Sequence, residues 1–165
     1  MRAPIAAFLL ALGAAPAATA ATGPAATPVA LDPRVEAVLA SSSISYTNDD
    51  GDFRLIYSLG NGRTQVVWIA SATARITKLE LRDVWSLAYR GTGQVPPEMA
   101  QRLLTENARM VLGAWQVNQS PDKFLVVYLA QVPADVDAAS LQEVVEAVAV
   151  SADRIEKELT DADEF

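Results

Sequence analysis

The side chains of this sequence that could do acid–base or metal chemistry are mainly carboxylates. The chain has no histidine and no cysteine, so the commonest general base, thiol nucleophiles and thiolate zinc sites are excluded. Three aspartates surround Gly51 in residues 49–52, as in a calcium loop. An EF-hand with Gly51 at its sixth position would place Tyr46 and Tyr57 where the two end acids belong. Because Asp-Gly favours a tight turn, we predict a hairpin here and no metal site.

A second pair of carboxylates, Glu80 and Asp83, could flank a groove as an acid and a base. Their spacing fits outward positions of a strand better. The three lysines have no serine in a recognisable catalytic motif, and no nucleophile elbow, P-loop or dinucleotide fingerprint is present in the sequence. We therefore predict a protein that is not an enzyme, with no catalytic, cofactor-binding or metal-binding residues.

The first twenty residues are typical of a secretory signal peptide. Arg2 precedes an apolar run over residues 3–15, which is too short to span a bilayer, and Ala18-Thr19-Ala20 supplies the small residues of a cleavage site. We predict cleavage after Ala20, a flexible linker over 21–32 and one domain over 33–165. The expected location is the periplasm or the exterior, and no later segment is apolar enough to be a transmembrane helix.

Charge is distributed unevenly along the chain. The formal net charge is −7, and from Asp135 onward ten acidic residues face two basic ones, Arg154 and Lys157. No basic stripe is present to attract phosphates, so a nucleic-acid partner is excluded. The acidic segment is either a solvated helix face or a docking surface for a basic partner.

Alternation of apolar and polar residues predicts strands over 44–47, 53–59, 64–70 and 76–89, with a bulge or bend near Asp83 in the last. Two further strands are predicted over 114–118 and 124–132. Helical spacing predicts a short helix from Pro33, a second from Pro97 to Gly113, and a third capped by Asp137 or Ser140. The third carries a narrow apolar seam: Leu141, Val145, Val148, Ala152, Ile155 and Leu159. This seam packs on the sheet or forms a dimer contact.

The element order is α-βββ(β)-α-ββ-α, which predicts an α+β fold with one antiparallel sheet packed by three helices. Trp68, Trp85 and Trp115 are expected in the core or on a sheet face. Asn107 falls on the apolar face of the second helix, where its amide needs partners. We expect it to bond the backbone of a neighbouring loop or strand.

Several segments resemble one known family. They are Ser45 to Phe53 before a β-meander, Leu103-Leu104-Thr105-Glu106-Asn107-Ala108 on a helix, Gln131-Val132-Pro133 after a hairpin, and Asp137 to Leu141 opening the last helix. Over about residues 33–160 the sequence is similar to YbjN-domain proteins, regulators proposed for bacterial sensory transduction. The resemblance implies a fold like that of type III secretion chaperones, which bind protein segments or dimerise. The signal peptide departs from the cytoplasmic location of such proteins.

From this resemblance we expect a non-enzymatic, periplasmic protein-binding module, chaperone-like or regulatory. Its partner would be an unidentified protein or a second copy of the chain. Trp85 and Tyr89 are the candidate protein-binding residues, because the bend predicted at Asp83 could turn them outward. The alternatives are a carrier of a small ligand and a carboxylate-dependent hydrolase.

Overall fold

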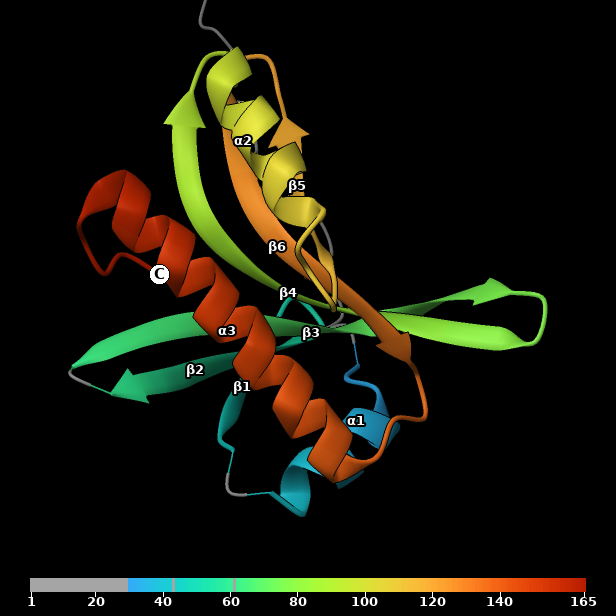
Figure 1. Ribbon diagram of the computed structural model, residues 1–165. Helices are drawn as coiled ribbons and strands as arrows, with labels where there is room; N and C mark the ends of the chain where they lie inside the picture. Colours follow the sequence, from blue (N-terminus) through green and yellow to red (C-terminus); the bar gives the residue numbers. More distant parts are fainter. Residues whose placement is uncertain (1–29, 43, 61) are drawn as a thin grey trace, which may run out of the picture.

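The computed structural model describes residues 30–42, 44–60 and 62–165. The predicted signal peptide, and the predicted linker up to residue 29, lie outside the described residues. The described chain is α+β, with three helices and one six-stranded antiparallel sheet (Figure 1). The class predicted from the sequence is therefore confirmed.

The sheet is an antiparallel meander of four strands, followed by a hairpin whose second strand joins the fourth. The strands are β1 (Tyr46–Asp49), β2 (Asp52–Gly60), β3 (Arg63–Ile76), β4 (Leu79–Thr92), β5 (Ala114–Gln119) and β6 (Lys123–Pro133). Their order across the sheet is β1-β2-β3-β4-β6-β5, so β4 and β6 lie in its interior. The helices are α1 (Pro33–Ala40), α2 (Pro97–Asn107) and α3 (Ala138–Thr160).

The first hairpin turns at the aspartate cluster, as the sequence predicts. Asp50 and Gly51 both have positive φ, 51° and 95°, which a two-residue hairpin of this hand requires. The Asn48 side chain accepts a hydrogen bond from the Gly51 N–H at 2.8 Å. Asp52 accepts one from the Ser71 N–H of β3, also at 2.8 Å. Asn48 and Asp50 therefore belong to the turn between β1 and β2, and Asp52 connects β2 to β3.

α1 and α3 begin at side-chain caps, whereas α2 begins after Pro96 without one. Asp32 accepts a hydrogen bond from the Arg34 N–H at the start of α1, and Pro33 occupies the first helical position. Asp137, one of the two predicted caps of α3, accepts hydrogen bonds from the Ser140 N–H and hydroxyl. The two caps fix where α1 and α3 leave the preceding loops and so aim their apolar sides at the sheet.

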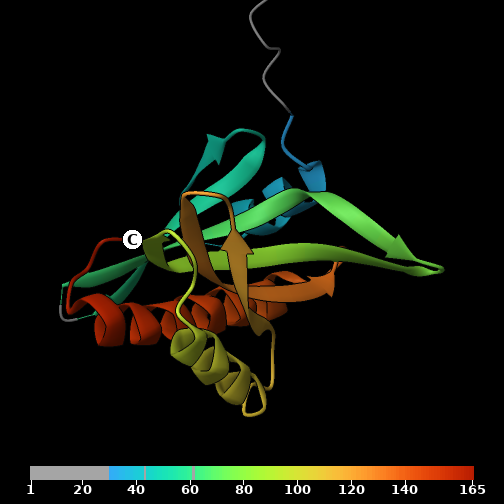
Figure 2. The ribbon, with the colours of Figure 1, turned by 90° about the horizontal axis from the view of Figure 1, so that it is seen from above.

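All three helices contribute to one core cluster on one face of the sheet, and Figure 2 shows α2 and α3 along that side. The apolar seam of α3 packs across β2, β3, β4 and β6, and its predicted members are buried except Leu159, which is half-buried. Val35 and Leu39 of α1 and Leu103 of α2 join the same core cluster. On the strands this covered face consists of alternate residues, among them Phe53, Leu55, Val67, Ile69, Val84, Val126, Tyr128 and Ala130.

The strands predicted over 44–47 and 76–89 are each shifted by two or three residues, to Tyr46–Asp49 and Leu79–Thr92. Two other boundaries differ by more. β3 continues to Ile76 and turns at Thr77, whose φ is 53°, so residues 71–75 are strand and not loop. α2 ends at Asn107 and not near Gly113. The amide of Asn107 bonds both the N–H and the carbonyl of Trp115, at 2.7 and 3.2 Å. This confirms the predicted backbone partner, and the chain leaves the helix to reach β5. No helix of the described part is long and apolar enough to cross a membrane.

Candidate functional site

The face of the sheet opposite the helices carries a second apolar layer, which we call the open face. Its members alternate with the covered residues along each strand and lie outside the core cluster. No described helix packs on it (Figure 2). Its apolar members are Ile56, Val66, Trp68, Leu81, Trp85, Leu87, Leu125, Val127 and Leu129.

A row of side chains crosses four strands at the centre of the open face. Arg54, Trp68, Trp85 and Leu129 are successive direct partners in the registers of β2, β3, β4 and β6. The two indole rings stack with centroids 4.3 Å apart and planes 6° apart. The Arg54 guanidinium lies 5.9 Å from the centre of the Trp68 ring. This row presents aromatic surface and one cation to the outside.

The indole of Trp68 is held in place from the neighbouring hairpin. Its Nε1–H donates a hydrogen bond to Asp49 at 2.8 Å. Beside the row, Val66, Leu87 and Val127 are only 8, 6 and 3 % exposed although no described helix covers them. The open face therefore combines these nearly buried side chains with half-buried tryptophans. A packed, pre-formed apolar surface binds a partner with little loss of side-chain entropy.

The open face continues onto an arm. Beyond the end of β6, β3 and β4 form a two-stranded ribbon that projects from the body (Figure 1). Ile76 and Leu79 are partners at its tip and are 63 and 48 % exposed. Leu79 is on the same side of β4 as Trp85 and Leu87, so the strip from Leu79 to Leu87, which is apolar except for Asp83, is about 26 Å long at about 3.3 Å per residue.

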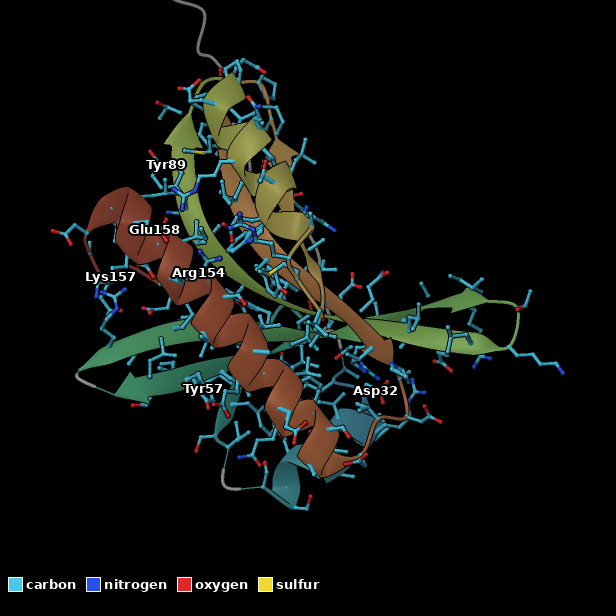
Figure 3. The ribbon with its side chains drawn as sticks, viewed as in Figure 1. Asp32, Tyr57, Tyr89, Arg154, Lys157 and Glu158 are labelled. Carbon is cyan, nitrogen blue, oxygen red and sulfur yellow. The ribbon has the colours of Figure 1, made fainter. Side chains whose placement is uncertain are left out.

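The two candidate binding residues lie on opposite faces. Trp85 is on the open face, as an interaction role requires. Tyr89 is the partner of Val126, contacts Phe124 with ring centroids 5.8 Å apart, and packs against the helix-covered core (Figure 3). The register of β4 shifts between Leu87 and Tyr89, which moves Tyr89 to the other face.

The predicted bend near Asp83 is on the neighbouring strand. Residues 70–72 of β3 lie opposite Asp83, because Ile69 is the partner of Val84 and Thr73 of Arg82. β4 itself runs in regular register with β6 from Leu81 to Leu87. The bend therefore does not reorient Trp85, whose outward position follows from simple alternation.

The carboxylates singled out from the sequence do not meet. Glu80 and Asp83 project from opposite faces of β4, because they are three residues apart on a regular strand. Glu80 accepts hydrogen bonds from Arg34 at 3.0 Å and Thr73 at 2.8 Å and lies 2.5 Å from Arg75, and these contacts, in that order, lower its pKa. Asp83 accepts a hydrogen bond from Gln131 at 3.1 Å. This geometry does not support a paired acid and base.

A buried ion pair stands behind α1. Arg82 is 1 % exposed, and its Nη2 lies 2.6 Å from Asp32, while Nη1 donates to the carbonyls of Ala70 and Ser71. The side chains of Arg34 and then Arg82 hold the pKa of Asp32 well below its usual range. Sequence reasoning missed this pair, because Arg82 reads as an outward strand position.

Next to this pair lies a small hollow. Its volume is about 300 Å³, and it is lined mainly by apolar side chains of α1, the loop before α3 and Leu141. Arg34 and Arg82 reach its wall. The Nε of Arg82 is buried and has no hydrogen-bond partner. Apolar walls with a few polar donors are typical of sites for small ligands.

One group of three acidic side chains is close enough to share a cation within the described ranges: Asp153, Glu156 and Asp163. Arg63 lies among them, with its Nε 2.6 Å from Asp153 and its Nη2 3.9 and 3.7 Å from Glu156 and Asp163. Burial raises the pKa of the Glu156 carboxyl, and hydrogen bonds from the N–H groups of residues 164 and 165 lower it. The guanidinium of Arg63 therefore occupies the position among these three carboxylates that a metal cation would take.

Comparison with known proteins gives no match: neither a family model nor a curated protein matches this sequence.

Proposed function

We propose that this chain is a non-enzymatic protein-binding module of the periplasm, and that its binding surface is the open face of the sheet. The observation that carries the proposal is the Trp68–Trp85 stack on an apolar sheet face that no described helix covers. Soluble monomers rarely expose a continuous apolar surface of this extent unless it binds something. Tryptophan, half-buried here at both positions, is also among the residues most enriched at the points that dominate binding energy.

The resemblance to YbjN-domain proteins supports the same role. It implies a chaperone-like fold in which a sheet and its flanking helices present a surface to a protein segment. The α+β architecture is compatible with that expectation. A chaperone-like or regulatory task in the periplasm would combine this binding surface with the export predicted from the first twenty residues.

Site-specific crosslinking tests the proposal. A photoreactive phenylalanine analogue replaces Ile56, which is 62 % exposed on the open face, or Leu104, which is 71 % exposed on α2 as the matched control. We expect a discrete crosslinked species from Ile56 in the periplasm and none from Leu104. Trp85→Ala should abolish that species while the fold persists by circular dichroism. Equal crosslinking from both positions, or a species that survives Trp85→Ala, would contradict the proposal.

A second candidate function, a carrier of a small ligand, is favoured by the hollow between α1 and α3. Its apolar walls and the unpaired Nε of Arg82 fit a small molecule with an apolar body and a hydrogen-bond acceptor. A thermal-shift screen of lipids and metabolites tests it. A rise of several degrees that disappears in Val38→Trp, which fills the hollow, would support the carrier; a rise unchanged by Val38→Trp would reject this site.

A further inference from the structure

The sheet splits between β3 and β4. The two strands are partners from Trp68–Trp85 to the tip of the arm, but residues 63–67 of β3 and 86–92 of β4 have no partners across this gap. Figure 1 shows the two strands diverging, with the end of the chain in the angle between them. We call this gap the fork. Unpaired strand edges of this kind are templates for another strand.

Side chains replace the backbone ladder at the closed end of the fork. Gln65 Nε2 donates to Ser86 Oγ at 3.0 Å and to the Leu87 carbonyl at 2.8 Å. Ser86 Oγ in turn donates to the Val66 carbonyl at 2.6 Å. Gln65 is fully buried, and its Oε1 has no hydrogen-bond partner. The closed end of the fork therefore contains a buried hydrogen-bond acceptor, Gln65 Oε1, that no donor satisfies.

The segment after α3, residues 162–165, lies at the open end of the fork. Arg63 Nη1 donates to the Ala162 carbonyl at 2.9 Å, and the Thr64 N–H donates to the Asp163 carboxylate at 3.3 Å. The Arg90 guanidinium lies 5.6 Å from the centre of the Phe165 ring. Only one backbone carbonyl of this segment and no backbone N–H bonds the two edge strands, so the segment covers the fork without pairing as a strand.

Both walls of the fork present a cation to this segment. Arg63 projects from β3 and Arg90 from β4, and the segment between them carries Asp163 and Glu164. The backbone of the same segment is bound to α3, because the Glu156 carboxylate accepts hydrogen bonds from the N–H groups of residues 164 and 165. The resident segment thus displays the chemistry that the fork recognises: an acidic stretch outside any helix or strand, with an aromatic ring at its end.

We propose that the fork is a second binding site, which takes an acidic, extended peptide segment with an aromatic residue by strand addition to residues 88–92 of β4. Residues 162–165 occupy its open end and compete with that peptide. The tether gives the resident segment an effective concentration on the order of millimolar, so the fork is masked until the segment is displaced. The fork begins beside the Trp68–Trp85 pair, but the contacts proposed for the peptide, with Arg63, Arg90 and the edge of residues 88–92, do not include the two tryptophans.

The test uses a fluorescein-labelled hexapeptide with the sequence of residues 160–165 and measures fluorescence anisotropy. The full chain is compared with a release variant, Asp163→Ala with Phe165→Ala, which removes the two side-chain contacts with the fork. We expect the release variant to bind the peptide about tenfold more tightly or better, as displacement of a tethered competitor predicts. Equal affinity for the two proteins would overturn the proposal.

Charge specificity is tested in the release variant. Arg90→Glu should abolish tight binding, whereas Arg109→Glu, at an exposed arginine beyond α2, should leave it unchanged. A hexapeptide with lysine at its acidic positions should not bind. Hydrogen exchange should show peptide-dependent protection of residues 88–92 and not of 79–83. Equal loss in the two arginine variants, or protection outside 88–92, would overturn strand addition at the fork. Trp85 is unchanged throughout, so failure here leaves the open-face proposal standing.

Discussion

The two faces of the sheet are built from the same strands but by different means. The covered face is closed by α1, α2 and α3 and contains side chains with almost no exposure, such as Phe53, Val84 and Val126. The open face is also apolar, yet no described helix packs on it, and its two stacked tryptophans are half-buried. The covered face therefore stabilises the fold, and the open face keeps apolar surface available for a partner. Substitutions on the two faces should separate stability from binding.

The largest expected difference in stability between the two faces is between two substitutions in β2. Phe53 is fully buried on the covered face and Ile56 is 62 % exposed on the open face. Phe53→Ala should lower the free energy of unfolding by about 3–5 kcal/mol, because it removes a buried ring and leaves a cavity. Ile56→Ala should cost less than about 1 kcal/mol. Urea unfolding measures both, and similar losses would show that the open face is covered in solution.

Adjacent residues of β4 give the next comparison. Arg82 is buried on the covered side with Asp32, and Asp83 is on the open face with one amide partner. Asp32→Asn should lower the free energy of unfolding at neutral pH by about 3 kcal/mol, because it leaves the Arg82 charge without its carboxylate. Asp83→Asn should change it by less than about 1 kcal/mol.

This comparison also has a pH dependence. The pKa of Asp32 is lower in the folded chain than in the unfolded chain, mainly because Arg34 and then Arg82 donate to its carboxylate. Its contribution to stability is therefore present above an unfolded pKa of about 4 and is lost as the pH falls below it. The stability gap between the unmodified chain and Asp32→Asn should narrow from pH 7 to pH 3. A constant gap would contradict the ion pair.

Much of this architecture follows from sequence pattern. The seam of α3, the Asp50-Gly51 turn, the cap at Asp137 and the role of Asn107 all depend on local spacing, and local spacing is visible in a sequence. The bend opposite Asp83 and the extension of β3 to Ile76 depend on the register between strands, which a single sequence does not encode in any simple period.

The candidate site was predicted only in part. Trp85 and Tyr89 were predicted together because the bend expected at Asp83 could turn both outward, and the structure places Trp85 on the open face by simple alternation. The register shift after Leu87 instead moves Tyr89 to the covered side. The stack of Trp68 on Trp85 depends on the β3–β4 register, and the fork depends on where that pairing stops. Neither leaves a local sequence pattern.

A smaller effect is expected from the tryptophan stack itself. Trp68→Ala and Trp85→Ala, alone and together, form a double-mutant cycle. Stacked aromatic pairs contribute about 0.5–1.5 kcal/mol beyond burial, and we expect a coupling energy in that range. Guanidinium unfolding of the four proteins measures it. A coupling near zero would show that the rings act independently and that the open face has no fixed aromatic centre.

The smallest effect on stability is expected at the tip of the arm. Leu79 is 48 % exposed and its partner Ile76 is 63 % exposed, so Leu79→Lys should change the free energy of unfolding by less than about 0.5 kcal/mol. If the apolar strip binds a partner along its length, the same substitution should weaken the Ile56 crosslink, because a charge at the tip must be desolvated on binding. Lys78→Ala, at an exposed residue of the same turn, is the control and should leave the crosslink unchanged. A full crosslink yield with Leu79→Lys would confine the binding surface to the centre of the sheet, around Trp85.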